Sequence, residues 1–354
     1  MHRISTLCSS LLFSLVILAG CNQRDSANVN ENGEGHPAVL VSDYFKYGDS
    51  VESAGVRLID IKTTVGNFKV WTKRFGSNSK IKILLLHGGP AMTHEYMECF
   101  ETFFQREGFE FYEYDQLGSY YSDQPKDSSL WTTSRFVEEV EQVRQAIGAD
   151  SSNFFLLGNS WGGILAMEYA LKYQHHLKAM VVANMMASAP EYGKYGDEII
   201  AKQMKPEVLT EIRAIEAKKD FNNPRYMELL IPNYYREHLC RLKEWPDAFN
   251  RSMKHVNAEV YTMMQGPSEF GISGRLATWD IKSRLHEIAV PTLMVGARFD
   301  TMDPKAMEEQ SKLVQKGHYL FCPNGSHLAM WDDQKIFMDG VIRFIRDVDA
   351  STIN

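Results

Sequence analysis

The pattern of apolar and polar positions predicts strands alternating with helices along most of the chain. Alternation over residues 56–61 and 66–73 predicts an antiparallel hairpin. Unbroken apolar runs further on predict buried strands of a parallel sheet, with helical periodicity between them, as over residues 136–147. These strands are expected at residues 81–86, 109–114, 154–157, 177–183, 291–296 and 319–321. The alternation predicts an α/β fold with a mainly parallel sheet and right-handed crossovers.

A tight turn joins the strand at 154–157 to the helix that follows it. The turn contains Gly158, Ser160 and Gly162 in a G-x-S-x-G pattern. A serine on so tight a turn needs small neighbours, because its backbone is strained and the flanking chains pass close. The turn lifts the hydroxyl clear of the sheet, beside helix N–H groups that can hold an oxyanion. We interpret Ser160 as a nucleophile, although an ordinary Gly/Ser turn has the same pattern.

Two further residues complete a catalytic triad in chain order. Asp300 follows the strand at 291–296, and His327 lies in a Gly-Ser-His loop after the last strand. The order Ser160, Asp300, His327 is that of α/β-hydrolases. His327 is expected to take the serine proton, while Asp300 fixes the imidazole tautomer and stabilises the imidazolium. Asp303 is a rival acid that lies farther from the end of the strand.

A His-Gly-Gly-Pro loop at residues 87–90 follows the strand at 81–86. Two glycines after a central strand let the backbone approach a ligand closely. In α/β-hydrolases this loop supplies the second oxyanion donor, so we expect the N–H of Gly89 to act beside that of Trp161. The alternative is a simple β-turn, which these residues would also form.

The N-terminus has the features of an export signal. A positive start precedes an apolar run over residues 11–18, which is too short to span a bilayer comfortably. The sequence Leu-Ala-Gly-Cys at 18–21 resembles a bacterial lipobox, with Cys21 as the lipid-bearing residue. The prediction is a signal peptide at 1–21, a flexible tether at 22–40 and a lipid-anchored protein of the cell envelope. If the organism has an outer membrane, that membrane is the expected site; a plain secretory signal is the alternative.

Composition and cysteine content bear on which partners, metals and disulfides the chain can have. The net charge of −7 and the pI near 5.9 argue against nucleic acid. No spacing of residues suggests a metal site. Cys99, Cys240 and Cys322 remain after the predicted signal. One disulfide between two of them is therefore possible, but three widely spaced cysteines do not indicate a disulfide framework.

Linked motifs give the chain a family resemblance over residues 80 to 340. They are HGGP at 87–90, YDQLG at 114–118, GNSWGG at 158–163, GPSEF at 266–270 and GSHLAMWDDQ at 325–334. In these the chain resembles the proline iminopeptidase family of α/β-hydrolases, especially its tricorn-interacting branch. The resemblance implies the α/β-hydrolase fold, with helices on both sheet faces, and catalysis without a metal or cofactor. It also implies a helical cap at 187–276, between core segments at 41–186 and 277–354.

The resemblance further assigns residues that bind the substrate amine. An exopeptidase needs a carboxylate to receive the ammonium group one residue's length from the serine. Glu269 stands where the family places its amine-binding glutamate, and Tyr261 matches a pocket tyrosine. A surface position in the cap is the alternative for Glu269.

The chain departs from the family pattern at three places. Relatives carry a second amine-binding glutamate after the triad aspartate, where this chain has Thr301. Either Asp303 is a carboxylate that compensates, or the substrate amine is bound less tightly. Ala91 replaces the usual glycine after HGGP, and residues 119–121 replace a small and basic stretch. We expect these changes to lie around the substrate rather than around the triad.

The leading hypothesis is therefore a serine aminopeptidase that acts through an acyl-enzyme on short peptides, including those that begin with proline. A carboxylesterase or amidase with the same triad is the nearest alternative. A lipoprotein that binds a ligand without hydrolysing it is a third. The expected partners are a small amide or ester substrate and, through the lipid anchor only, a membrane.

Overall fold

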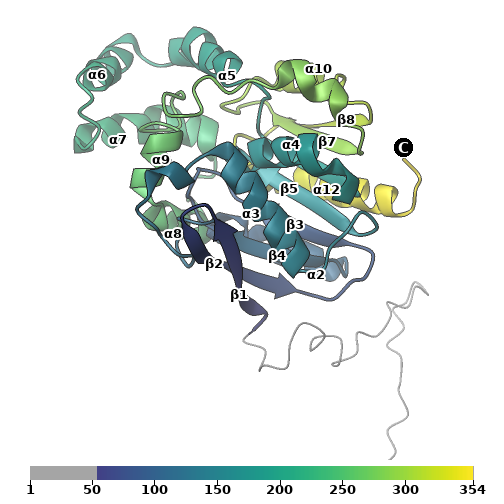
Figure 1. Ribbon diagram of the computed structural model, residues 1–354. Coiled ribbons are helices and arrows are strands. Elements are labelled where there is room, and N and C mark those ends of the chain that lie inside the picture. The colour runs from purple at the N-terminus through teal and green to yellow at the C-terminus, as the bar shows by residue number, and fades with distance from the viewer. Residues whose placement is uncertain (1–53, 354) are drawn as a thin grey trace, which may run out of the picture. The chain divides into compact units, whose positions relative to one another are not determined.

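The computed structural model describes residues 54–353, which build an eight-stranded sheet in the order β1-β2-β4-β3-β5-β6-β7-β8 (Figure 1). The strands are β1 Val56–Thr63, β2 Gly66–Phe75, β3 Lys82–Leu86, β4 Glu110–Asp115, β5 Phe154–Asn159, β6 Ala179–Ala183, β7 Thr292–Ala297 and β8 Gly317–Cys322. The hairpin β1–β2 and the pair β2–β4 are antiparallel, and the pairs from β4 through β8 are parallel. The expected mainly parallel sheet is confirmed, and each expected strand is present.

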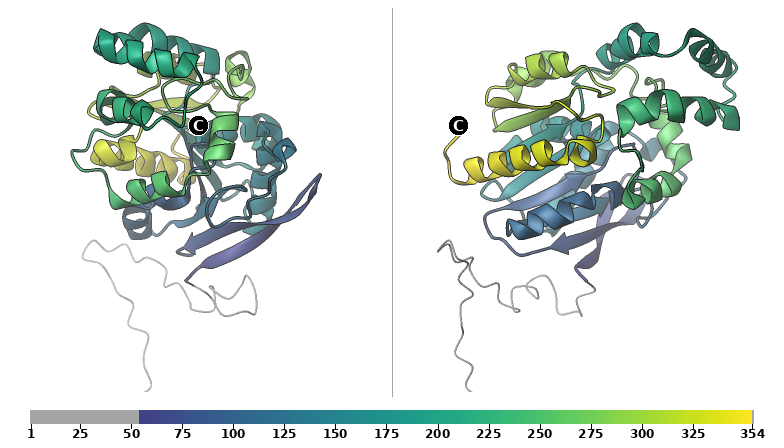
Figure 2. Two further views of the ribbon diagram at one scale, coloured as in Figure 1. Left: turned by 90° about the vertical axis from the view of Figure 1, so that its left-hand side faces the viewer. Right: turned by 180° about the vertical axis from the view of Figure 1, so that it is seen from behind.

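Helices cover both faces of the sheet, because successive residues of its buried strands point to opposite sides. The helices of the two layers are α2 Cys99–Arg106, α3 Thr133–Ala146, α4 Trp161–Tyr173, α10 Pro304–Ser311 and α12 Gln334–Asp349; the short α11 spans Ala329–Asp332. Leu84 and Leu86 of β3 pack in one apolar cluster with α3 and α4, whereas Ile83 and Leu85 pack in another with α2 and α12. Figures 1 and 2 show these two layers on either side of the strands.

A run of helices separates β6 from β7 and lies beyond one end of the sheet (Figure 2). It contains α5 Ala189–Tyr195, α6 Pro206–Ala217, α7 Pro224–Leu230, α8 Asp247–His255 and α9 Ala258–Met264, together with the π-helical segment η7, Ile231–Leu239. We call residues 187–276, which include these elements, the helical insertion. The division of the chain into core and cap domains stays a prediction.

The predicted signal peptide, the tether and Cys21 lie outside the described residues. Within 54–353, none of the helices is long and apolar enough to cross a membrane. In the described part of the chain, Cys99, Cys240 and Cys322 are all buried free thiols, so the possible disulfide among them is not formed there.

Candidate active site

Ser160 lies on the turn between β5 and α4 in a backbone conformation that few residues adopt. Its φ is +56° and its ψ is −124°, and such strained residues concentrate at functional sites. A Cβ on Gly158 would lie 2.0 Å from the carbonyl oxygen of Gly162, and a Cβ on Gly162 would lie 1.9 Å from that of Leu86. Both positions therefore require glycine, which gives the G-x-S-x-G pattern its physical basis.

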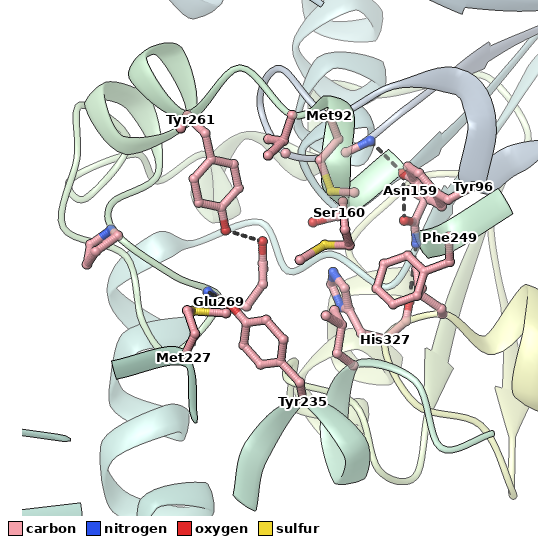
Figure 3. Close-up of a pocket in the computed structure, with 18 of the residues that line it drawn as sticks. Met92, Tyr96, Asn159, Ser160, Met227, Tyr235, Phe249, Tyr261, Glu269 and His327 are labelled. Carbon is pink, nitrogen blue, oxygen red and sulfur yellow. Dashed lines mark hydrogen bonds between the residues drawn. The ribbon is translucent and has the colours of Figure 1, made fainter. Parts of the chain in front are cut away.

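His327 and Asp300 lie on the loops after β8 and β7, at the edge of the sheet that carries Ser160. Nδ1 of His327 donates a hydrogen bond to Oδ1 of Asp300 at 2.8 Å. Nε2 has no hydrogen-bond partner among the described residues, and His327 lines the same pocket as Ser160 (Figure 3). Burial lowers the pKa of His327, but the negative charge and the hydrogen bond of Asp300 together raise it by more. The pKa of His327 is therefore raised overall. The structure thus brings the three expected residues together.

The rival acid, Asp303, has a different place. Its carboxylate caps the first turn of α10 by accepting the Lys305 N–H at 2.9 Å. It does not line the pocket that contains Ser160. Asp303 is therefore neither the partner of His327 nor a replacement for the missing amine-binding glutamate.

Asn184, directly after β6, holds Asp300 in place and was not foreseen from the sequence. Its Nδ2 donates to Oδ2 of Asp300 at 2.7 Å and to the Ser326 carbonyl at 3.2 Å. The residue has a φ of +54°, and its Oδ1 is buried without a partner among the described residues. Both features cost stability, so its contact with the triad carboxylate is the role we assign to it. A polar residue at the carboxyl end of a buried strand was the available signal.

The loop after β3 presents backbone N–H groups beside Ser160. The Gly88 N–H is donated to the Tyr96 hydroxyl at 2.6 Å. The N–H groups of Gly89 and Trp161 have no acceptor among the described residues. Gly89 has a φ of +114°, and a Cβ there would lie 2.6 Å from the Met92 nitrogen. The two expected oxyanion donors are thus unoccupied, and glycine is required at one of them.

A buried network joins the two elements that carry these donors. Gln116 donates its backbone N–H to Nε2 of His87 and its side-chain amide to the carbonyl of the same residue, at 3.2 and 2.9 Å. Its Oε1 accepts the indole N–H of Trp161 at 2.8 Å. Burial lowers the pKa of His87 to about 4, which keeps the ring neutral so that Nε2 can accept. This network explains why the Asp-Gln motif accompanies the His-Gly-Gly-Pro loop.

Tyr96 is a second residue that sequence reasoning missed, and it gives a testable prediction. Its hydroxyl accepts the Gly88 N–H and donates to Oδ1 of Asn159 at 3.0 Å, which connects the oxyanion loop to the strand before Ser160. Tyr96→Phe leaves both groups buried and unpaired, so we expect kcat to fall about tenfold with KM changed less than about twofold. Steady-state kinetics on a prolyl arylamide measures this. Tyr169→Phe is the matched control, because its buried hydroxyl bonds Glu141 outside the pocket. Equal losses of kcat in both variants would contradict the assignment.

The pocket in front of Ser160 has a volume of about 280 Å³ and a mostly apolar wall. It lies between the loops at the end of the sheet and the helical insertion, and Figure 3 shows Ser160 and His327 across from Glu269 and Tyr261. Its apolar side chains include Met92, Met227, Leu239, Phe249, Met253 and Val256. The pocket suits a small apolar acyl group whose far end carries a positive charge.

Glu269 is buried at the pocket wall and is fixed by tyrosines of the helical insertion. Oε1 of Glu269 accepts a hydrogen bond from the Tyr261 hydroxyl at 2.5 Å. The backbone N–H of Glu269 donates to the Tyr235 hydroxyl oxygen at 3.2 Å. Its carbonyl accepts the hydroxyls of Tyr192 and Tyr234 at 2.5 and 2.8 Å. Burial raises the pKa of Glu269. The charge of His327 and the hydrogen bond from Tyr261 lower it by less, so the pKa is raised overall. The expected amine-binding pair is brought together, and the surface alternative for Glu269 is wrong.

The departures from the family pattern lie in three different surroundings. Ala91 keeps the left-handed conformation, with a φ of +61°, that a glycine adopts more easily. The rings of Tyr120 and Tyr121 lie tilted against each other with centroids 3.9 Å apart, and Tyr120 stacks on His255 at 3.9 Å. Neither tyrosine lines the pocket. The expectation that these changes surround the substrate is therefore wrong for the tyrosine pair.

The same expectation is wrong for Thr301. The side chain is buried, and its Oγ1 lies 3.0 Å from Nδ1 of His327. It does not line the pocket. Thr301, at the position where the resemblance led us to expect a second glutamate, thus contacts the triad.

Comparisons with known proteins agree with this fold and site. A family model described as "alpha/beta hydrolase fold" matches residues 82–334, so the chain is an α/β-hydrolase. It is 79% identical to the proline iminopeptidase of Flavobacterium johnsoniae over 297 residues, which cover 84% of this chain and 100% of that protein. It is equally identical to the proline iminopeptidase of Elizabethkingia meningoseptica over 299 residues, with the same coverage. The crystal structure of the proline iminopeptidase of Mycobacterium smegmatis is similar with a TM-score of 0.75 at 26% identity, covering 84% of this chain and 99% of that one. The chain belongs to the proline iminopeptidase family.

Proposed function

We propose that the protein is a serine aminopeptidase that releases N-terminal proline from short peptides. The observation that carries the proposal is the buried carboxylate of Glu269, which lines the same small pocket as Ser160 and His327. A buried carboxylate needs a cationic partner, and the free ammonium of a peptide is one. The names of the relatives at 79% identity point to proline as the residue that is released.

The geometry supports an acyl-enzyme mechanism in two halves. In the first half, Oγ of Ser160 attacks the carbonyl carbon of the N-terminal residue while Nε2 of His327 takes the hydroxyl proton. The N–H groups of Gly89 and Trp161 stabilise the negative oxygen of the tetrahedral intermediate. His327 then gives the proton to the departing amine, and the C–N bond breaks.

The second half returns the enzyme to its starting state. His327 takes a proton from water, and the resulting hydroxide attacks the acyl carbon. The ester bond to Ser160 breaks, its Oγ regains the proton, and the amino acid leaves with a new carboxylate. Throughout, Asp300 holds Nδ1–H and stabilises the imidazolium, while Glu269 and Tyr261 hold the substrate amine.

The decisive experiment compares free and blocked amines. Prolyl, alanyl and other aminoacyl arylamides are assayed beside their N-acetylated forms and simple esters. We expect the prolyl arylamide to be the best substrate and acetylation to abolish its turnover. Equal or better activity on blocked amides or plain esters would make the protein a general carboxylesterase or amidase. Failure of a fluorophosphonate probe to label the protein would favour a ligand-binding role instead.

We also propose that Cys21 carries a lipid anchor in the cell envelope. The support is the apolar run at residues 11–18 followed by the lipobox-like sequence at 18–21. Expression with a radiolabelled fatty acid tests the proposal. Labelling of the wild-type protein that disappears in Cys21→Ala is expected, whereas an unlabelled, freely released protein would indicate a plain secretory signal.

A further inference from the structure

Thr301 makes contacts that its position in the family pattern does not explain. It follows Asp300 directly, and its side chain is completely buried. Oγ1 lies 3.0 Å from Nδ1 of His327 and 3.4 Å from Oδ1 of Asp300. The Thr301 hydroxyl therefore contacts both His327 and Asp300, the two triad residues that support the nucleophile.

The chemistry of the three groups fixes the direction of each hydrogen bond. A carboxylate only accepts, so Nδ1 of His327 carries the proton that is donated to Asp300. The Thr301 oxygen accepts a second branch of the same N–H, and its own O–H is donated to Oδ1 of Asp300. The three side chains thus form a closed ring of hydrogen bonds on the side of the imidazole away from Nε2.

We propose that Thr301 is a positioning residue that holds the His327 ring in the plane from which Nε2 serves Ser160. The proposal rests on the proposed function only in taking His327 as the base. With one acceptor, the imidazole can still tilt through small changes in its two side-chain torsions while it keeps its bond to Asp300. A second acceptor beside the first restricts that tilt, and catalysis depends steeply on such orientation.

The proposal has a consequence for the substrate amine. Because Thr301 is committed to the triad and Asp303 to the cap of α10, Glu269 is the carboxylate of the pocket that remains for the ammonium group. Position 301 then serves the catalytic base rather than the substrate amine.

The test separates these two roles by using substrates with and without an amine. Thr301→Val keeps the shape and removes the hydroxyl, Thr301→Ser keeps the hydroxyl, and Thr301→Ala is a smaller second variant. Each is assayed with prolyl p-nitroanilide and with p-nitrophenyl acetate, and the rate of labelling by a fluorophosphonate is followed. Thr72→Val is the control, since its buried hydroxyl bonds the Arg57 carbonyl at 2.9 Å outside the pocket.

We expect Thr301→Val and Thr301→Ala to lower kcat about five- to tenfold on both substrates, with KM nearly unchanged and slower labelling. Thr301→Ser should recover most of the activity. A loss confined to prolyl p-nitroanilide and expressed in KM would overturn the proposal in favour of a substrate role. Unchanged kinetics, or no recovery in Thr301→Ser, would overturn it as well. The ester and labelling measurements keep their meaning even if the protein does not release proline.

Discussion

Ser160→Ala is expected to lower kcat at least about 10⁴-fold on every substrate, because no other group is placed to form the acyl-enzyme. The strained turn holds Oγ at the pocket, and the glycines around it leave no room for a compensating shift. The variant should still fold, since alanine keeps the Cβ at the same backbone angles. Binding of a prolyl product or analogue should therefore persist. Assay of a prolyl arylamide, with intact-mass analysis after fluorophosphonate treatment, measures both effects.

Ser119→Ala provides the matched control for this experiment. Ser119 is completely buried, its Oγ has no partner among the described residues, and it does not line the pocket. Its replacement should leave kcat and probe labelling unchanged. Residual activity of Ser160→Ala above about 1% of wild type, or a probe adduct on another residue, would show that the nucleophile is misassigned.

Glu269→Gln is expected to reduce kcat/KM for prolyl arylamides about 100-fold, while plain esters are hydrolysed at nearly the wild-type rate. Glutamine keeps the shape and an oxygen for the Tyr261 hydroxyl, but it lacks the charge that pairs with the ammonium in a desolvated site. Glu216→Gln is the control, because Glu216 also accepts a tyrosine hydroxyl, that of Tyr226, but does not line the pocket. Equal losses on amine and ester substrates would instead indicate a structural role for Glu269.

The pH profile gives the same prediction a second readout. Burial raises the pKa of Glu269, so the carboxylate loses its charge at a higher pH than an exposed glutamate does. As pH falls through that pKa, kcat/KM for prolyl arylamides should fall with it. His327, whose pKa is also raised, must be neutral to act as a base and contributes a second acid limb. Ester hydrolysis by wild type, and both reactions of Glu269→Gln, should retain only the limb of His327.

The elements and the triad could be predicted because local sequence determines them. Apolar runs define the central strands, and the glycines of G-x-S-x-G are required where a Cβ would collide with a neighbouring backbone carbonyl. Chain order then places Asp300 and His327, since the carboxyl ends of parallel strands meet at one edge.

The supporting residues could not be predicted in the same way. Tyr96 has no local signal, because its role depends on the meeting of its hydroxyl with Gly88 and with Asn159, 63 residues further on. Thr301 misled the sequence analysis for a related reason. A position in a motif says which residue is replaced, whereas the direction of the new side chain depends on its length and on the acceptors around it.

The proposed amine receptor and the catalytic triad are encoded in separate stretches of the chain. Glu269 and the four tyrosines that hold it all come from residues 187–276, whereas Ser160, Asp300 and His327 lie on loops of the sheet outside that stretch. One contiguous segment of the gene therefore encodes the residues that we expect to bind the substrate amine. Substitutions confined to that segment could therefore change which substrates bind while the catalytic triad stays the same.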